Sequence, residues 1–272
     1  MSLHPRHRIM IDLGYAGATA IVTGGTRGIG REVVALLLKQ GAHVLAVGSR
    51  RETADTLRTE CEHEHLAVVA QDMRAEECGD VLVDEAMRAF GRVDLVVNNA
   101  AAFDYSPSES LTRVDWLELF TLKTLGYWSL ATAAAPELAR RRGAIVNVSG
   151  VAGVVASPDT VHVGASNAAI ISMTESMAKG LAPRGIRLNA VSPGATDTDR
   201  FTTRASLVAE REGIEQSAAR GQLAALIPVG HPADPAEVAL VIAVLGAPAL
   251  RSVTGAHVLV DGGGSLGGRR RA

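Results

Sequence analysis

Cysteine and lysine are scarce in this chain of 272 residues, and both scarcities limit what the protein can be. The two cysteines, Cys61 and Cys78, fall in segments that we expect to be helices flanking the surface. Two such thiols do not make a disulfide framework, which favours a reducing compartment. Of the 27 basic residues only Lys39, Lys123 and Lys179 are lysines, so a lysine inside an apolar segment stands out.

The chain also lacks a strong net charge and a long apolar run. Its formal net charge of −2 provides no electrostatic field for nucleic acid or for an anionic membrane. No stretch approaches the ~18 apolar residues of a membrane span, and the N-terminus has no apolar core of signal-peptide length. We therefore expect a cytoplasmic protein without nucleic-acid or membrane partners, and the sequence indicates no metal site.

Apolar residues make up 47 % of the chain, enough for a sizeable core. Apolar runs predict strands at Thr19–Val22, His43–Val47, Leu66–Ala70, Val93–Val97, Ala144–Val148, Ile186–Val191 and His257–Val260. Amphipathic stretches predict helices at Gly28–Gln40, Arg51–His63, Glu76–Phe90, Val114–Arg140, Thr160–Leu181 and Pro235–Leu245. This alternation predicts an α/β fold, a Rossmann-type doubly wound parallel sheet of about seven strands with helices on both faces.

The domain organisation follows from the same pattern. Residues 1–262 read as a single domain, because the core elements continue without a linker. Residues 197–230 mix helix formers with charges between two core elements, which indicates a helical excursion over the substrate site. Residues 263–272, glycines followed by arginines, are typical of a flexible tail.

A glycine-rich turn follows the first predicted strand and opens a helix, which is the setting of a nucleotide-binding loop. Gly24 permits a tight turn, Gly28 lets backbone N–H groups approach a pyrophosphate, and Gly30 lets the helix lie close to the strand. The residues expected to bind the cofactor here are Thr23, Gly24, Thr26, Arg27, Gly28, Ile29 and Gly30.

The end of the second predicted strand favours NADP(H) over NAD(H). An NAD-binding chain usually places an Asp or Glu there for the ribose hydroxyls, but this chain reads Gly48-Ser49-Arg50-Arg51. Arg50, together with Arg27 of the loop, would pair with a 2′-phosphate, because a guanidinium matches phosphate oxygens with forked donors. The alternative is that Arg50 and Arg51 are solvated charges at a helix start.

These residues resemble the TGxxxGxG loop of the short-chain dehydrogenase/reductase family, and the resemblance covers nearly the whole chain. Further matches are Asp72-Met73, Asn99-Ala100 within Asn98–Ala101, Pro193-Gly194 with Thr198, and Val253–Gly255 with Val260–Gly263. The resemblance implies that Asp72, Met73, Asn99, Ala100, Pro193, Gly194 and Thr198 contact the cofactor. It also implies a small-molecule substrate and a homo-oligomer, either a dimer or a tetramer.

The family's catalytic tetrad does not match. The resemblance places the catalytic Tyr at Val163, the Lys at Asn167, the Ser at Gly150 and the Asn at Lys123. Valine has no ionisable proton, and an asparagine carries no charge to lower the pKa of a phenol. The family's tyrosine-dependent chemistry therefore cannot operate in this chain.

Lys123 is the only charged residue between Glu118 and Glu137 and has no acidic i±3 or i±4 partner. This indicates a cleft, a cofactor phosphate or ribose, or a substrate anion, unless its ammonium snorkels to solvent. Lys123 stands where the family has Asn, and Asn167 stands where the family has Lys, so the two residue types look exchanged across one cleft. His162, next to the vacant tyrosine position, is a second candidate acid or base, although a surface or helix-cap histidine is the plainer interpretation. Tyr105 and Tyr127 are hydroxyls that either approach the substrate or only pack.

Three functions remain open at this point. The first is an atypical NADP(H)-dependent oxidoreductase for a small carbonyl or hydroxyl substrate, with Lys123, His162 and Asn167 as candidate catalytic residues. The second is a non-redox isomerase, lyase or cyclase on the same scaffold. The third is a cofactor-binding pseudoenzyme. The sequence does not identify the substrate.

Overall fold

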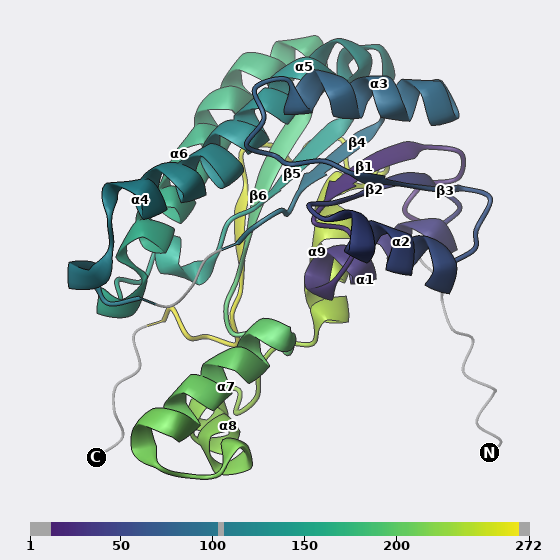
Figure 1. Ribbon diagram of the computed structural model, residues 1–272. Coiled ribbons are helices and arrows are strands. Elements are labelled where there is room, and N and C mark those ends of the chain that lie inside the picture. Colours follow the sequence, from purple (N-terminus) through teal and green to yellow (C-terminus); the bar gives the residue numbers. More distant parts are fainter. Residues whose placement is uncertain (1–11, 103–105, 267–272) are drawn as a thin grey trace, which may run out of the picture.

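The computed structural model describes residues 12–102 and 106–266. Its centre is a parallel sheet of seven strands in the order β3-β2-β1-β4-β5-β6-β7 (Figure 1). The strands are β1 (Thr19–Thr23), β2 (His43–Gly48), β3 (Leu66–Ala70), β4 (Leu95–Asn98), β5 (Ala144–Val148), β6 (Arg187–Pro193) and β7 (His257–Val260). The predicted doubly wound fold is confirmed, because consecutive strands build outward in both directions from β1.

Helices cover both faces of the sheet (Figure 1). One face carries α1 (Gly28–Lys39), α2 (Arg51–Glu60) and α9 (Pro235–Gly246), and the other carries α3 (Cys78–Phe90), α5 (Gly126–Arg141) and α6 (Val161–Leu181). Short 3₁₀ turns lie at Ser108–Ser110, Val151–Gly153, Pro158–Thr160 and Ala182–Arg184. Cys78 lies in α3, as expected, and its thiol is free and buried. No helix within the described residues is long and apolar enough to cross a membrane.

The helix predicted over Val114–Arg140 is interrupted, and this is the main departure from the expected elements. The structure has α4 (Arg113–Leu119), a π-helical segment η2 (Phe120–Leu125) and then α5. A capping box between Thr112 and Asp115 starts α4, with the Asp115 carboxylate accepting from Thr112 N at 2.7 Å. The π segment widens one turn of the helix and contains Lys123. Such segments are often found at functional sites.

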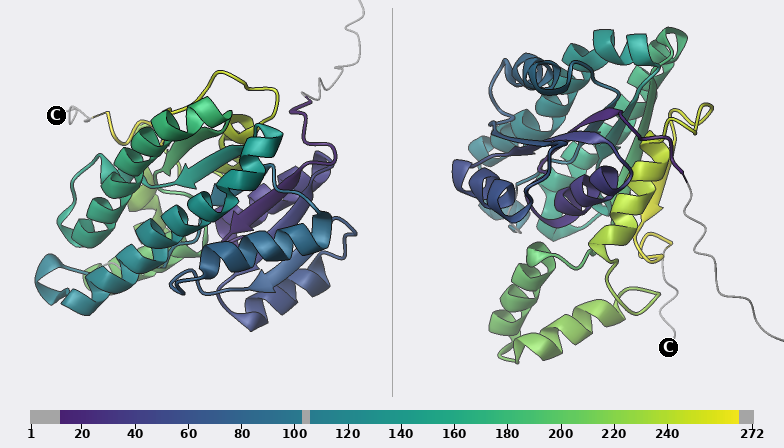
Figure 2. Two further views of the ribbon diagram at one scale, coloured as in Figure 1. Left: turned by 90° about the horizontal axis from the view of Figure 1, so that it is seen from above. Right: turned by 90° about the vertical axis from the view of Figure 1, so that its right-hand side faces the viewer.

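The excursion over residues 197–230 contains two helices, α7 (Asp199–Glu212) and α8 (Gln216–Ala225). They form a hairpin that stands away from the sheet layers (Figure 2). Phe201, Ala205 and Leu223 form a small apolar cluster between the two helices. The two ends of the excursion are joined beside the sheet, where Asp197 N donates to Ala233 O at 2.9 Å. The hairpin is therefore anchored at its base and packs mainly on itself.

The chain after β7 begins with a hydrogen-bonded turn. The Asp261 carboxylate accepts hydrogen bonds from Gly263 N at 3.0 Å and from Ser265 N at 2.7 Å. These bonds form a turn at 263–266, and the flexibility of the tail stays a prediction. The rest of the tail, residues 267–272, lies outside the described residues.

Candidate functional site

The candidate site lies at the carboxyl edge of the sheet. Strands β1 and β4 are neighbours there, although their flanking strands continue in opposite directions. Parallel sheets bind ligands in the crevice at such a switch point. The glycine loop after β1 enters this crevice, as do the segments after β4, β5 and β6. The sequence therefore brings its matched motifs to one edge of the sheet.

The glycine loop has the backbone shape of a phosphate cradle. Gly24 and Gly28 have φ angles of +64° and +52°, a region that glycine adopts at little cost. A Cβ on Gly30 would collide with the carbonyl oxygen of Gly24, so only glycine lets α1 begin this close to β1. The N-terminal N–H groups of α1 are oriented toward the loop and favour a bound anion. The cradle therefore fits a dinucleotide pyrophosphate.

Thr23 and Asn99 connect the glycine loop to the chain after β4. Thr23 Oγ1 accepts from Asn99 N at 2.9 Å and from Ala100 N at 3.0 Å. The Asn99 side chain donates in return to Thr23 O at 3.0 Å and to Gly24 O at 3.2 Å. Thr23 is fully buried, so its role in this structure is to shape the loop.

The outer end of the crevice carries positive charge. Arg27 and Arg50 are exposed at the starts of α1 and α2, and neither forms an ion pair with another residue of the described chain. The Asp72 carboxylate is held by Arg74 at 2.9 Å, and the hydrogen bond from Arg74 lowers the pKa of Asp72. Met73 is buried beside it. Thr26 and Ile29 complete this side, with Ile29 against the core.

The other end of the crevice is formed by the chain after β6. Pro193 ends that strand, and Gly194 N donates to Val260 O at 2.9 Å. A Cβ on Gly194 would lie 2.8 Å from Asp261 Cα, so a glycine is needed for the close approach of the chain after β7. Thr198 crosses over the glycine loop, and its Cγ2 would lie 3.4 Å from a Cβ on Gly28. The motifs matched in the sequence therefore face one another.

Lys123 is buried at the centre of the site, with only 3 % of its surface exposed. Its Nζ donates to Ser149 O at 2.9 Å and to the side-chain oxygen of Asn167. No carboxylate of the described residues forms an ion pair with it. Burial, aided by the charge of Arg200, lowers the pKa of Lys123 to about 7. Snorkelling to solvent, the alternative left open by the sequence, is wrong.

The positions matched to the tetrad lie together, although their side chains differ from the family pattern. Lys123 and Asn167 are in direct contact, as the exchange hypothesis requires. Gly150 follows β5, and a Cβ there would lie only 2.7 Å from Asn167 Nδ2. Val163 is buried and contributes no hydroxyl. Ser149 Oγ donates to Asn167 O at 2.9 Å, which fixes the backbone of α6 beside β5.

His162 is buried rather than exposed, which corrects the surface interpretation. Its ring lies 6.2 Å from the ring of Trp116 in α4, and its Nδ1 has no hydrogen-bond partner among the described residues. Burial lowers the pKa of His162, while the charge of Asp115 opposes this shift. The sequence could not reveal this burial, because α4 approaches His162 only in the folded chain.

Tyr127 packs beneath the site. Its hydroxyl lies 3.0 Å from Ala100 O and 3.2 Å from Val148 O, and the side chain is fully buried. Burial raises the pKa of Tyr127, which makes its proton harder to remove. The packing interpretation therefore describes Tyr127 better than substrate contact does. Tyr105 lies outside the described residues.

Arg200, one of the charged residues of the excursion, is a site residue that the sequence pattern did not single out. Its guanidinium donates to Ala101 O at 3.3 Å, so the first turn of α7 is tied to the chain after β4. Its charge adds to the lowering of the pKa of Lys123 by burial, and it opposes part of the rise that burial causes in the pKa of Tyr127. The only signal in the sequence was its position two residues after Thr198.

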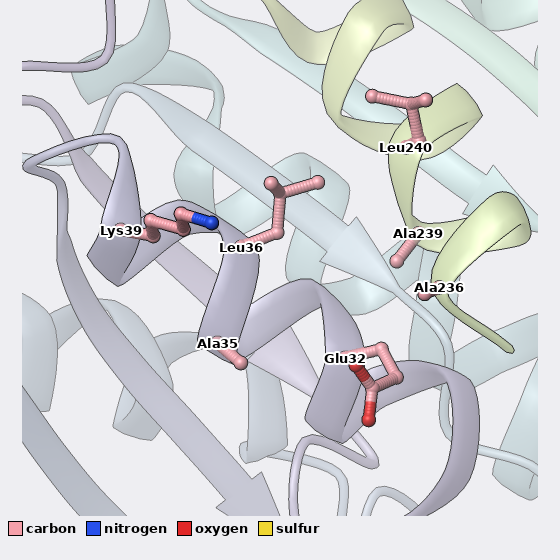
Figure 3. A pocket seen from close by; sticks show the side chains of 7 residues that line it. All are labelled: Glu32, Ala35, Leu36, Lys39, Ala236, Ala239 and Leu240. Carbon is pink, nitrogen blue, oxygen red and sulfur yellow. The ribbon is translucent and has the colours of Figure 1, made fainter. Parts of the chain in front are cut away.

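A separate shallow groove lies between α1 and α9 (Figure 3). It is lined by Glu32, Ala35, Leu36, Lys39, Ala236, Ala239 and Leu240. None of these is a cofactor-loop or cleft residue, so this groove is distinct from the candidate site. Within the described part of the chain, no group of three or more His, Cys, Asp or Glu residues could hold a metal ion.

Known proteins resemble this chain over nearly its full length. Residues 24–265 match the family model described as enoyl-(acyl carrier protein) reductase. L-fucose dehydrogenase of Bos taurus is 33% identical over 95% of this chain and 93% of its own length. The 3-oxoacyl-(acyl-carrier-protein) reductase of Thermotoga maritima is 31% identical over 91% of this chain and 97% of its own.

Solved structures also resemble this chain over nearly its full length. The ligand-free aldohexose dehydrogenase of Thermoplasma acidophilum has a TM-score of 0.85 at 25% identity, covering 95% of this chain and 98% of its own. The L-sorbose reductase of Gluconobacter frateurii, complexed with NADPH and L-sorbose, shares the fold with a TM-score of 0.87 at 24% identity, covering 95% and 100%. The chain therefore belongs to the short-chain dehydrogenase/reductase family, whose members are oxidoreductases that bind a nicotinamide cofactor.

Proposed function

We propose that this protein is an NADP(H)-dependent oxidoreductase that interconverts a small carbonyl compound and its alcohol, with Lys123 as the acid–base residue. The observation that carries the proposal is the buried Lys123 ammonium, held by Ser149 O and Asn167 at the carboxyl edge of the sheet. A group whose pKa lies near neutrality both gives and takes a proton efficiently, and the pKa of Lys123 is about 7.

Each part of the crevice has a task in this proposal. NADP(H), when bound, supplies or accepts the hydride, and the glycine loop holds its pyrophosphate. In the direction of reduction, Lys123 Nζ gives a proton to the substrate oxygen and becomes a neutral amine. In the direction of oxidation, the neutral amine takes the hydroxyl proton. The carbonyl of Ser149 and the side-chain oxygen of Asn167 keep Nζ in place in both states.

The preference for NADP(H) over NAD(H) rests on Arg27 and Arg50. Both guanidinium groups are exposed at the outer end of the crevice, and the second strand ends without an acidic residue. Titration with NADPH and NADH tests the preference. We expect tighter binding of NADPH, and Arg50→Gln should reduce the difference between the two cofactors. Equal binding of both would favour solvated charges, and binding of neither would contradict the whole site assignment.

Stopped-flow absorbance of NADPH with a panel of aldehydes and ketones tests the reaction. We expect the wild type to oxidise the cofactor, and we expect the rate to be about 100-fold or more lower in Lys123→Met. Lys179→Met is the matched control, because Lys179 is an exposed lysine of α6. Equal turnover of Lys123→Met and the wild type would remove Lys123 from the mechanism.

A cofactor-binding protein without turnover is the second candidate. The low exposure of Lys123 favours it, because a proton donor must reach its substrate. NADPH binding without oxidation by any carbonyl compound would support this candidate. A non-redox enzyme would give the same result but would convert a substrate without consuming the cofactor.

The hairpin of α7 and α8 would cover the substrate, because Arg200 at its start already contacts the chain after β4.

The protein would also form a homo-oligomer. Large apolar side chains are exposed along α4, η2 and α5, namely Val114, Leu117, Leu125 and Trp128. Apolar side chains gathered in this way are typical of a protein interface.

A further inference from the structure

The orientation of the Asn167 side-chain amide is fixed by Lys123. An ammonium group has three donors and no acceptor, so it must face the oxygen of the amide and not its nitrogen. The contact between Lys123 Nζ and Asn167 Oδ1 therefore assigns the amide without ambiguity. Asn167 Nδ2, the donor end, is turned away from the lysine.

The donor end of Asn167 points to the place where residue 150 has no side chain. A Cβ on Gly150 would lie 2.7 Å from Nδ2, closer than to the amide carbon at 3.4 Å or the amide oxygen at 3.6 Å. Gly150 is half-buried and directly follows Ser149 at the carboxyl end of β5. Substrates of parallel α/β proteins bind at this edge. Glycine thus leaves the amide open toward the crevice.

Asn167 Nδ2 has no acceptor among the described residues, although the side chain is only 3 % exposed. Nδ2 is also not among the fully buried atoms that lack a partner, so it keeps some accessible surface and can donate to a ligand oxygen. Lys123, at the other end of the same amide, adds a positive charge close by. Together these groups favour an oxygen that is an acceptor and that gains negative charge.

We infer that the Asn167 amide is the hydrogen-bond donor that binds the carbonyl or hydroxyl oxygen of the substrate, and that Gly150 is required because it leaves room for this amide. The inference rests on the proposed function for the identity of the substrate. It makes Lys123 a positioning residue for Asn167 in addition to its role as the acid–base group. It also makes Lys123, Gly150 and Asn167 one coupled set, in which a change at one position disturbs the others.

The test uses 1,1,1-trifluoroacetone and its hydrate as a fluorine NMR probe on the protein loaded with NADP⁺. The oxidised cofactor cannot reduce the probe, so binding is measured whether or not the protein has an oxidoreductase activity. Asn167→Asp keeps an oxygen for Lys123, replaces the donor with a second acceptor oxygen and adds a negative charge beside Lys123. Gly150→Ala places a methyl group against Nδ2, and its extended backbone, with φ of 163°, accepts any residue.

We expect both variants to bind the probe about fivefold or more weakly, the effect of losing one hydrogen bond. Gly180→Ala is the control, because a Cβ there meets nothing within 4 Å. If a substrate is turned over, kcat in Asn167→Asp should fall about 100-fold, as for other donors to a developing oxyanion.

Three results would overturn the inference. The first is probe binding in Asn167→Asp equal to that of the wild type. The second is tight probe binding in Gly150→Ala with an intact fold, measured by urea unfolding. The third is loss of NADP⁺ binding in Asn167→Asp, which would place Asn167 against the cofactor. If both variants lose probe binding as expected but no carbonyl compound is turned over, the proposed function is contradicted. The inference about the oxygen site would still hold.

Discussion

A lysine ammonium inside a protein is stable only where its charge is compensated or its proton is lost. Lys123 has two neutral oxygens as partners, Ser149 O and Asn167 Oδ1, and the charge of Arg200 acts against it. Neutral acceptors replace only part of the hydration of an ammonium group. The residue therefore keeps a proton that is easily removed, and this property has a measurable effect on stability.

The free energy of unfolding should rise with pH above 7 because of Lys123. Its pKa is about 7 in the folded chain and ~10.4 in an unfolded chain. Between these values the unfolded chain binds one proton more, so stability increases with pH. Below pH 7 both states are charged and the burial penalty is fully present. We expect the wild type to gain about 1 kcal/mol per pH unit relative to Lys123→Met between pH 7.5 and 9.

Urea unfolding of both proteins across this range measures the effect, with Lys179→Met as the control for a surface lysine. Parallel stability curves for the wild type and Lys123→Met would show that Lys123 does not lose its proton in the folded chain.

Arg187 is a second buried cation, and it has a structural task. Its guanidinium donates to Leu245 O at 2.7 Å, Ala247 O at 2.9 Å and Gly246 O at 3.1 Å, at the C-terminal end of α9. These carbonyls have no partners within the helix and carry its negative dipole end. Arg187→Met should lower the free energy of unfolding by about 3 kcal/mol, because it leaves Leu245 O and Gly246 O buried without donors. Arg184→Met, at an exposed arginine, should change it by less than about 0.5 kcal/mol in the same urea measurement.

At the scale of elements, local patterns predicted the fold well and the site in part. Each predicted strand is present, because the apolar runs are short, buried and separated by amphipathic helices. The glycine loop was predictable for the same reason, since its spacing depends on neighbours in the chain. The π segment η2 was not predictable, because nothing in residues 120–125 marks an extra residue in the turn. The burial of His162 and the contact of Arg200 depend on elements distant in sequence.

The hairpin of α7 and α8 should open independently of the sheet. Its own apolar cluster is small, and Arg220 adds one ion pair to Asp197 at 2.5 Å and a cation–π contact 5.0 Å from the ring centre of Phe201. Phe201→Ala removes the largest side chain of this cluster. We expect hydrogen exchange over residues 199–225 to become about tenfold faster, while the amides of the sheet keep their rates.

Leu207→Ala is the control for this experiment, because Leu207 lies on α7 but is 46% exposed. Equal acceleration in the hairpin and the sheet after Phe201→Ala would mean that the two regions unfold together and that the hairpin is not a separate lid.

At the scale of the whole molecule, the crevice and the outer helices are determined by different features of the sequence. The crevice is specified by turns and glycines that bring four strand ends together. The outer surface of α4, η2 and α5 is specified by side chains that the fold leaves exposed. Leu125 and Trp128 are 54% and 52% exposed although Lys123, shortly before them in the chain, is buried. An interface on this surface would therefore bear directly on the segment that positions the lysine.

The proposed homo-oligomer gives the last prediction. The double variant Leu125→Glu with Trp128→Glu places two carboxylates in the apolar surface, and like charges from two copies would repel when buried together. Light scattering after gel filtration should give a multiple of 28.3 kDa for the wild type and 28.3 kDa for the variant. Leu226→Glu, at an exposed leucine just after α8, should keep the oligomer. A wild type of 28.3 kDa would exclude the oligomer, and an oligomeric double variant would place the interface elsewhere on the molecule.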